Sequence, residues 1–148
     1  MSDYQRILLA VDLKEEDDTP VSEKAISIAK STGAQISVVH VVEPIYNYGI
    51  PPGTESRISE WEKELEETAK DKLKKVGEKL SIPADRQFIG VGQIRQQILR
   101  TAEMINADMI VVGTHSRHGL SRLIMGDTAE DMLHSAKCDV LAIHINKS

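Results

Sequence analysis

Residues 109–128 read Met-Ile-Val-Val-Gly-Thr-His-Ser-Arg-His-Gly-Leu-Ser-Arg-Leu-Ile-Met-Gly-Asp-Thr, and this stretch decides the fold class. Its apolar start stops at Gly113, a polar and basic loop follows, and Gly126 comes just before a predicted helix. This order of strand, glycine loop and helix is how α/β proteins offer free backbone N–H groups to an anion, because the first-turn donors have no partner within the helix. We therefore expect an α/β protein with a candidate ligand site at this loop.

Five apolar runs predict strands, at residues 6–12, 35–42, 86–91, 107–113 and 140–145. The first run is continuous, without alternating polar residues, which is typical of a strand buried on both faces of a parallel sheet. Apolar residues spaced by three or four predict helices over 21–32, 54–80, 93–106 and 128–136.

The acidic segment 13–19 is expected to be a connector, with Pro20 close to the start of the first helix and Gly33 just past its end. Strands and helices then alternate along the whole chain. This order predicts one α/β domain over residues 1–148, built as a doubly wound, five-stranded parallel sheet with helices on both faces.

Composition narrows the range of functions. The net charge of -5 gives the surface as a whole no attraction for nucleic acid or anionic lipid. With one Trp, one Phe and three Tyr, the chain offers little for stacking single-stranded bases. We therefore expect neither nucleic acid nor a membrane as a partner.

The cysteine count and the first apolar run bear on location. The single cysteine, Cys138, allows no intramolecular disulfide, which fits a reducing compartment. The apolar run near the N-terminus is too short for a signal peptide or a membrane span, so a cytoplasmic location is expected. His115 and His118 have an i, i+3 spacing but no third ligand nearby in the sequence, so no metal site is predicted.

Ligands of doubly wound sheets bind at the carboxyl ends of the strands, where the strand order reverses. In this chain those ends carry Asp12, Val41 and Gly113, which are therefore the first candidates for a binding site.

Four segments together resemble the universal stress proteins of the UspA superfamily, and the resemblance spans essentially the whole chain. They are Ile7-Leu8-Leu9-Ala10-Val11-Asp12, Ala34-Gln35-Ile36-Ser37-Val38-Val39-His40-Val41, Asp108-Met109-Ile110-Val111-Val112-Gly113-Thr114-His115 and Cys138-Asp139-Val140-Leu141-Ala142-Ile143. The resemblance implies an adenine-nucleotide α-hydrolase-like, Rossmann-like fold. It also implies that Asp12 lies near a nucleotide ribose and that the backbone of Val41 lies by the adenine ring.

Nucleotide-binding members of this family carry Gly, two residues, Gly, nine residues, Gly, and then Ser or Thr. Gly113 and Gly126 match the first and third glycines of that pattern. Ser116 replaces the second glycine, Asp127 replaces the Ser or Thr, and Thr128 comes one position late. The resemblance therefore implies an ATP-binding loop that has diverged at two of its four signature positions.

Asp127 is the larger departure, because its carboxylate would repel phosphate and can cap the last helix itself. Glu130 lies three residues on, in a pattern related to the capping box. Against this, Arg117 and Arg122 in the same loop are cations that could hold a polyphosphate, and Asp127 could instead help to bind Mg²⁺. The sequence leaves a closed loop and an altered nucleotide site both open.

No nucleophile–base pair, G-x-S-x-G motif or complete P-loop occurs, so we do not expect an enzyme, and no cofactor is required. The first hypothesis is a non-enzymatic, dimeric stress-response protein that acts on unknown protein partners. In this family the last strand commonly pairs with its twin, which makes that strand the candidate interface: Val140, Leu141, Ala142, Ile143, His144 and Ile145.

The second hypothesis is a sensor that still binds ATP or another adenine nucleotide. Its candidate binding residues are Asp12, Val41, Gly113, Ser116, Arg117, Gly126, Asp127 and Thr128. A third, a flavodoxin-like or electron-transfer-flavoprotein relative, shares the fold class.

Overall fold

The computed structural model describes residues 4–43, 55–115 and 135–145. The elements along this part of the chain are β1 (Arg6–Ala10), α1 (Glu15–Thr32), β2 (Gln35–Val42), α2 (Glu55–Leu80), η2 (Ala84–Arg86), β3 (Gln87–Val91), α3 (Ile94–Met104), β4 (Met109–His115) and β5 (Asp139–Ile145). The five strands form one sheet in the order β3-β2-β1-β4-β5, and every neighbouring pair is parallel. This confirms the predicted doubly wound α/β fold.

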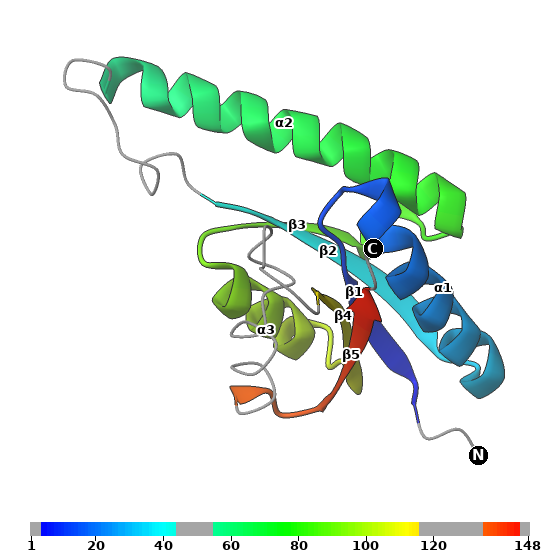
Figure 1. The fold of residues 1–148 in the computed structure, drawn as a ribbon. Helices are drawn as coiled ribbons and strands as arrows, with labels where there is room; N and C mark the ends of the chain where they lie inside the picture. The colour runs from blue at the N-terminus through cyan, green and yellow to red at the C-terminus, as the bar shows by residue number, and fades with distance from the viewer. Residues whose placement is uncertain (1–3, 44–54, 116–134, 146–148) are drawn as a thin grey trace.

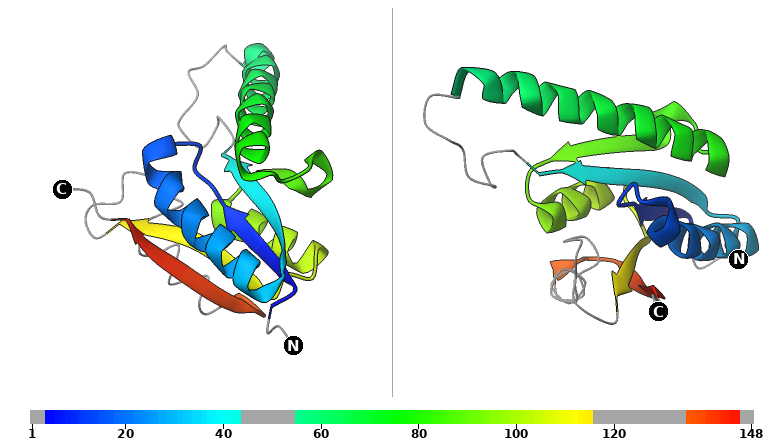
Figure 2. Two further views of the ribbon diagram at one scale, coloured as in Figure 1. Left: turned by 90° about the vertical axis from the view of Figure 1, so that its right-hand side faces the viewer. Right: turned by 45° about the horizontal axis from the view of Figure 1, so that its top comes forward.

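Helices cover both faces of the sheet (Figure 1). On one face, α1 packs over β1, β4 and β5 while α2 packs over β2 and β3. On the other face, α3 packs against β2 and β3, as the two views in Figure 2 also show. The central strand β1 is buried between the two layers of helices, and Ile7, Leu8 and Leu9 have no exposed surface. This burial on both faces explains why the strand has no alternating polar residues.

The first helix is longer than predicted. It begins at Glu15, inside the acidic segment that was expected to be a connector, and Pro20 lies within it. The first backbone bond runs from the N–H of Asp18 to the carbonyl of Lys14, at 2.8 Å. Acidic residues are favourable at a helix N-terminus, where the partial charge is positive, so the charge run that suggested a connector supports a helix instead. Its end is as predicted: Gly33 adopts a left-handed φ of 76°.

The fourth strand was predicted to end at Gly113 but continues through Thr114 and His115. These two residues pair with His144 and Ile145 of β5. Pairing with a neighbouring strand extends β4 beyond its apolar run, and the sequence of β4 alone does not reveal this. The other boundaries differ from the predictions by a few residues. The helix predicted over 128–136 lies almost entirely outside the described residues.

The long helix α2 is only partly covered by the sheet. Ala69 and Leu73 are buried, whereas Trp61 and Leu65, on the same predicted stripe, are 37% and 46% exposed. The N-terminal half of α2 extends past the sheet in Figure 1. Spacing of three or four predicts which side of a helix is apolar, but not how far the layer beneath it reaches.

Gly77 lies in the buried half of α2, and the close approach of other groups accounts for it. A Cβ at this position would come within 2.9 Å of the Ile82 carbonyl oxygen and would overlap the side chain of Gln87. That side chain donates a hydrogen bond of 2.9 Å from Nε2 to the same carbonyl. The glycine therefore makes room for the turn that joins α2 to β3.

None of the helices in the described ranges combines the length and the apolar character needed to span a bilayer.

We predict that Leu73→Ala lowers the free energy of unfolding by about 2–4 kcal/mol, because it opens a cavity in a well-packed core. Leu65→Ala in the same helix is the matched control and should cost less than about 1 kcal/mol, because Leu65 is largely exposed. Urea unfolding followed by circular dichroism measures both values. Equal losses would contradict the packing of α2 described above.

Candidate functional site

The strand order reverses between β1 and β4. From β1 the chain continues to β2 and β3 on one side, and β4 and β5 lie on the other. Ala10 pairs with Val39, and Leu9 pairs with Val111. Asp12, Val41 and Gly113 follow Ala10, Val39 and Val111 by two residues each. All three therefore lie at the carboxyl end of the sheet, which we call the strand edge. The structure thus brings together three residues that are far apart in the sequence, at the position where doubly wound sheets bind ligands.

Asp12 is the polar group of this edge. Its side chain is 16% exposed, and Oδ2 has no hydrogen-bond partner within the described part of the chain. The Nζ of Lys14 lies 3.8 Å from Oδ2, which is too long for a hydrogen bond. A largely buried carboxylate oxygen without a donor is unfavourable, so this atom is suited to accept hydrogen bonds from a ligand.

The turn after β1 holds Asp12 in place. The Asp12 N–H donates to Oδ1 of Asp18 at 2.9 Å, which ties the turn to the first part of α1. Leu13 adopts a φ of 62°, a left-handed conformation that a non-glycine residue takes up at a cost of about 1 kcal/mol. Strained backbone of this kind is concentrated at functional sites. Asp18 was not among the residues predicted for the site. The sequence feature that could have indicated it is the acidic run at the start of α1.

His40 joins β1 to β2 beside this turn. Its Nδ1 lies 2.9 Å from the carbonyl oxygen of Val11. Because a carbonyl only accepts, Nδ1 carries the proton and Nε2 is unprotonated in the neutral ring. Burial lowers the pKa of His40, and the charge of Lys72 lowers it further, against the raising effects of the Val11 hydrogen bond and Asp12. His40 is therefore a strand histidine whose Nδ1 donates to a backbone carbonyl.

Val41 and Gly113 complete the described edge. Val41 is half-buried, packs against the core on the α3 side and pairs with Gly90 of β3. Gly113 is buried in β4 and pairs with Ile143. Val41 and Gly113 both lie near the carboxyl ends of their strands.

The phosphate-binding part of the predicted site lies outside the described residues. This applies to Ser116, Arg117, Gly126, Asp127 and Thr128. Within the described ranges, no group of three or more His, Cys, Asp or Glu side chains could hold a metal ion. The described edge offers a hydrogen-bond acceptor and apolar walls, which suits binding of a hydroxylated ligand.

The predicted interface residues lie on β5, which is an edge strand because it pairs only with β4 in the described sheet. Leu141 and Ile143 are half-buried against the core under α1, and Val140 packs toward the α3 side. Ala142 and His144 are exposed. The strand thus has a half-buried apolar side next to an unpaired backbone edge.

Comparisons with known proteins agree with this architecture. A profile of the universal stress protein family matches residues 3–144. The chain is 37% identical over 148 residues, covering 100% of both sequences, to universal stress protein A homolog 2 of Coxiella burnetii. The fold of the present chain is similar to that of universal stress protein UspA from Lactobacillus plantarum, with a TM-score of 0.75. The two sequences are 22% identical, over 97% of this chain and 99% of that chain.

A universal stress protein whose structure was solved in complex with cAMP has a TM-score of 0.63 and 16% identity, over 98% of this chain and 100% of that chain. At these identities, the likeness to the two solved structures shows a common fold.

We predict that His40 titrates below its ordinary pKa of 6.5 in the folded protein. Between this lower folded pKa and the ordinary value of 6.5, His40 binds a proton in the unfolded chain but not in the folded chain. This contribution to stability is therefore complete above about pH 6.5 and is lost as the pH falls toward the lower folded pKa. An NMR titration of the imidazole signals measures the folded pKa, and urea unfolding at several pH values measures the loss.

The control is His40→Asn, whose amide can still donate to Val11 but does not titrate in this range. Its stability should depend less on pH between 7 and 5 than that of the parent protein. A His40 that titrates above 6.5 would contradict the burial described here.

Proposed function

The chain belongs to the universal stress protein family, as its sequence resemblance indicated, and on that premise we propose that it is a cytoplasmic, homodimeric stress-response protein that works without catalysis. In this proposal the two copies pair through β5, and the dimer acts by contacts with other proteins or by nucleotide-linked regulation. The observation that carries the proposal is the edge strand β5, which is half-apolar and pairs on one side only within the described sheet.

An edge strand with apolar side chains invites pairing with other chains, and a symmetric partner covers it without leaving a second open edge. In a two-fold pair of strands the middle residues of the two copies lie close together. Ala142 is near the middle of β5 and is exposed, so it is placed near the axis in this proposal.

We expect the parent protein to be a dimer by native mass spectrometry at micromolar concentration, and Ala142→Asp to raise the dissociation constant at least about tenfold. The reason is that two like charges would face each other across the axis. Ala84→Asp is the matched control, because Ala84 is an exposed alanine in η2, next to the opposite edge of the sheet, and should leave the dimer intact. A parent protein that is monomeric under these conditions would overturn the proposal.

A second candidate function, an adenine-nucleotide sensor, is favoured by one observation. Oδ2 of Asp12 is buried and has no hydrogen-bond donor among the described residues, at the end of the sheet where Val41 and Gly113 also lie. A ribose supplies two hydroxyl donors to such an oxygen. The cAMP complex of a related fold supports a ligand of this class.

The two candidates differ at the phosphate loop. In the first, the carboxylate of Asp127 occupies the N–H groups at the start of the following helix and keeps phosphate out. In the second, Arg117 and Arg122 offset that charge and the nucleotide binds with altered phosphate contacts. Removing the carboxylate therefore tests the role of the loop directly.

We predict that Asp127→Ser strengthens ATP binding about tenfold relative to the parent protein, because it removes a charge that repels phosphate. Adding Asp12→Ala to Asp127→Ser should weaken binding again, because the ribose loses its acceptor. Isothermal titration calorimetry measures all three proteins, with Asp85→Ser, at an exposed acid in η2, as the control for charge.

Detectable ATP binding by the parent protein supports the sensor, and binding only by Asp127→Ser supports a closed loop. If neither the parent nor Asp127→Ser binds ATP, the sensor is eliminated, and the dimer measurement alone then decides the first proposal.

A further inference from the structure

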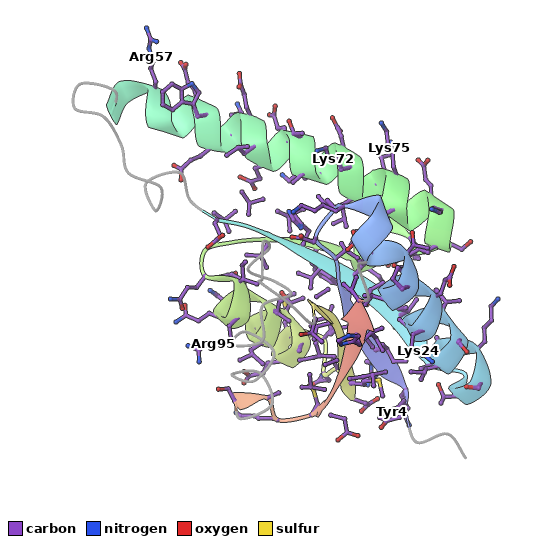
Figure 3. All side chains as sticks on the ribbon, viewed as in Figure 1. Tyr4, Lys24, Arg57, Lys72, Lys75 and Arg95 are labelled. Atoms are coloured by element: carbon purple, nitrogen blue, oxygen red, sulfur yellow. The ribbon has the colours of Figure 1, made fainter. Side chains whose placement is uncertain are left out.

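A groove of about 660 Å³ runs between α1 and α2, on the sheet face opposite α3. Both helices contact β2, while α1 also contacts β1, β4 and β5 and α2 also contacts β3, and the groove lies between the two helices. The groove is distinct from the strand edge at Asp12, Val41 and Gly113. Figure 3 marks Lys72 and Lys75, which line it from α2, and Lys24, which lies on α1 outside it.

The walls of the groove are apolar. Leu13, Ile26, Val76 and Leu80 line it, and all four are partly buried against the core beneath α1 and α2. The same side chains thus complete the core on one side and face the groove on the other. A groove of this size falls within the range of small-ligand pockets, about 300–1,000 Å³.

The charged side chains that line the groove are mostly cationic. They are Lys30, Lys72, Lys75, Lys79, Asp18 and Glu23. Of the two acids, Asp18 already accepts a hydrogen bond from the Asp12 N–H. Four lysines against two acids is a local excess of positive charge on a chain whose net charge is -5. The electrostatic complement of this groove is an anion.

Two of the lysines come together at one end. Lys30 lies in the last turn of α1 and Lys79 in the last turn of α2. Both also line a smaller hollow of about 380 Å³, which shares Ile26 and Leu80 with the groove. Each lysine complements the C-terminal dipole of its own helix. The helix C-termini themselves carry partial negative charge, so the two ammonium groups are the charges at this end that can attract an anionic group.

We propose that this groove binds a single-chain amphiphilic carboxylate, with its carboxylate between Lys30 and Lys79 and its alkyl chain along Ile26 and Val76. Burial of the chain against these apolar side chains supplies most of the binding free energy. Lysine stems can cover apolar surface while their ammonium groups stay in water, so apolar walls and positive charges can act on the same ligand. The carboxylate sets the orientation and excludes cationic amphiphiles.

The probe is dodecanoate below its micellar concentration, added to the full-length protein in a calorimetric titration. Dodecyltrimethylammonium has the same alkyl chain and the opposite charge, and should bind at least about tenfold more weakly. The double variant Lys30→Gln/Lys79→Gln should weaken dodecanoate binding roughly five- to tenfold, as expected for two exposed charge pairs. The matched control Lys24→Gln/Lys74→Gln removes two exposed lysines of the same helices that do not line the groove, and should bind as the parent does.

A third variant, Ser27→Phe, tests the location. Ser27 lines the groove from an exposed position on α1, so a phenyl ring there should fill the groove without disturbing the core, and far-ultraviolet circular dichroism checks the fold. Loss of dodecanoate binding in folded Ser27→Phe supports the proposal. It is overturned if the parent protein does not bind dodecanoate, if Ser27→Phe binds it as well as the parent, or if the cationic amphiphile binds equally well.

Discussion

The burial of β1 between two helical layers is the constraint on which the rest of the structure depends. Ile7, Leu8 and Leu9 are fully enclosed, so helices must cover both faces of the sheet and the strands beside β1 must run parallel to it. A strand buried in this way at the centre of a doubly wound sheet also defines where the strand order reverses. The candidate ligand edge and the free edge at β5 both follow from that single position in the sheet.

The position of β1 has a chemical consequence at its carboxyl end. The chain must leave the buried strand abruptly, and it does so through Asp12 and the left-handed Leu13 into a helix that starts at Glu15. Asp18 secures this turn through the Asp12 N–H, while no donor from residues 4–43, 55–115 or 135–145 reaches Oδ2 of Asp12. The same turn therefore ends the central strand and presents an acceptor to the site. Structural and binding roles meet there because both need the carboxylate to be held in place.

Two neighbouring parts of one sheet face differ in how tightly they are filled. Beneath α1 and α2 the core is closed by residues such as Val21, Ala25 and Leu73. Between the helices the packing opens into the groove lined by Ile26, Val76 and the lysines. Two helices that lie side by side on one sheet face leave such a gap unless large side chains fill it. Here the side chains at the rim are lysines, which cannot leave water.

The sequence by itself determined the fold class, the family and most of the element bounds, because continuous apolar runs and the spacing of three or four record which side chains must leave water. It also identified Asp12, Val41 and Gly113 as residues of one strand edge, since chain order in a parallel α/β fold fixes which strand ends lie together. It missed the start of α1, because an acidic run suits both a solvated connector and a helix N-terminus. Only the tertiary structure decided that Asp12 has a buried oxygen with no donor in the described part of the chain, that Trp61 and Leu65 stay exposed, and that Lys30 and Lys79 line one groove. Each of these features depends on how far a helix extends past the sheet, or on which side chains from distant parts of the sequence lie near each other. Local sequence patterns encode neither property.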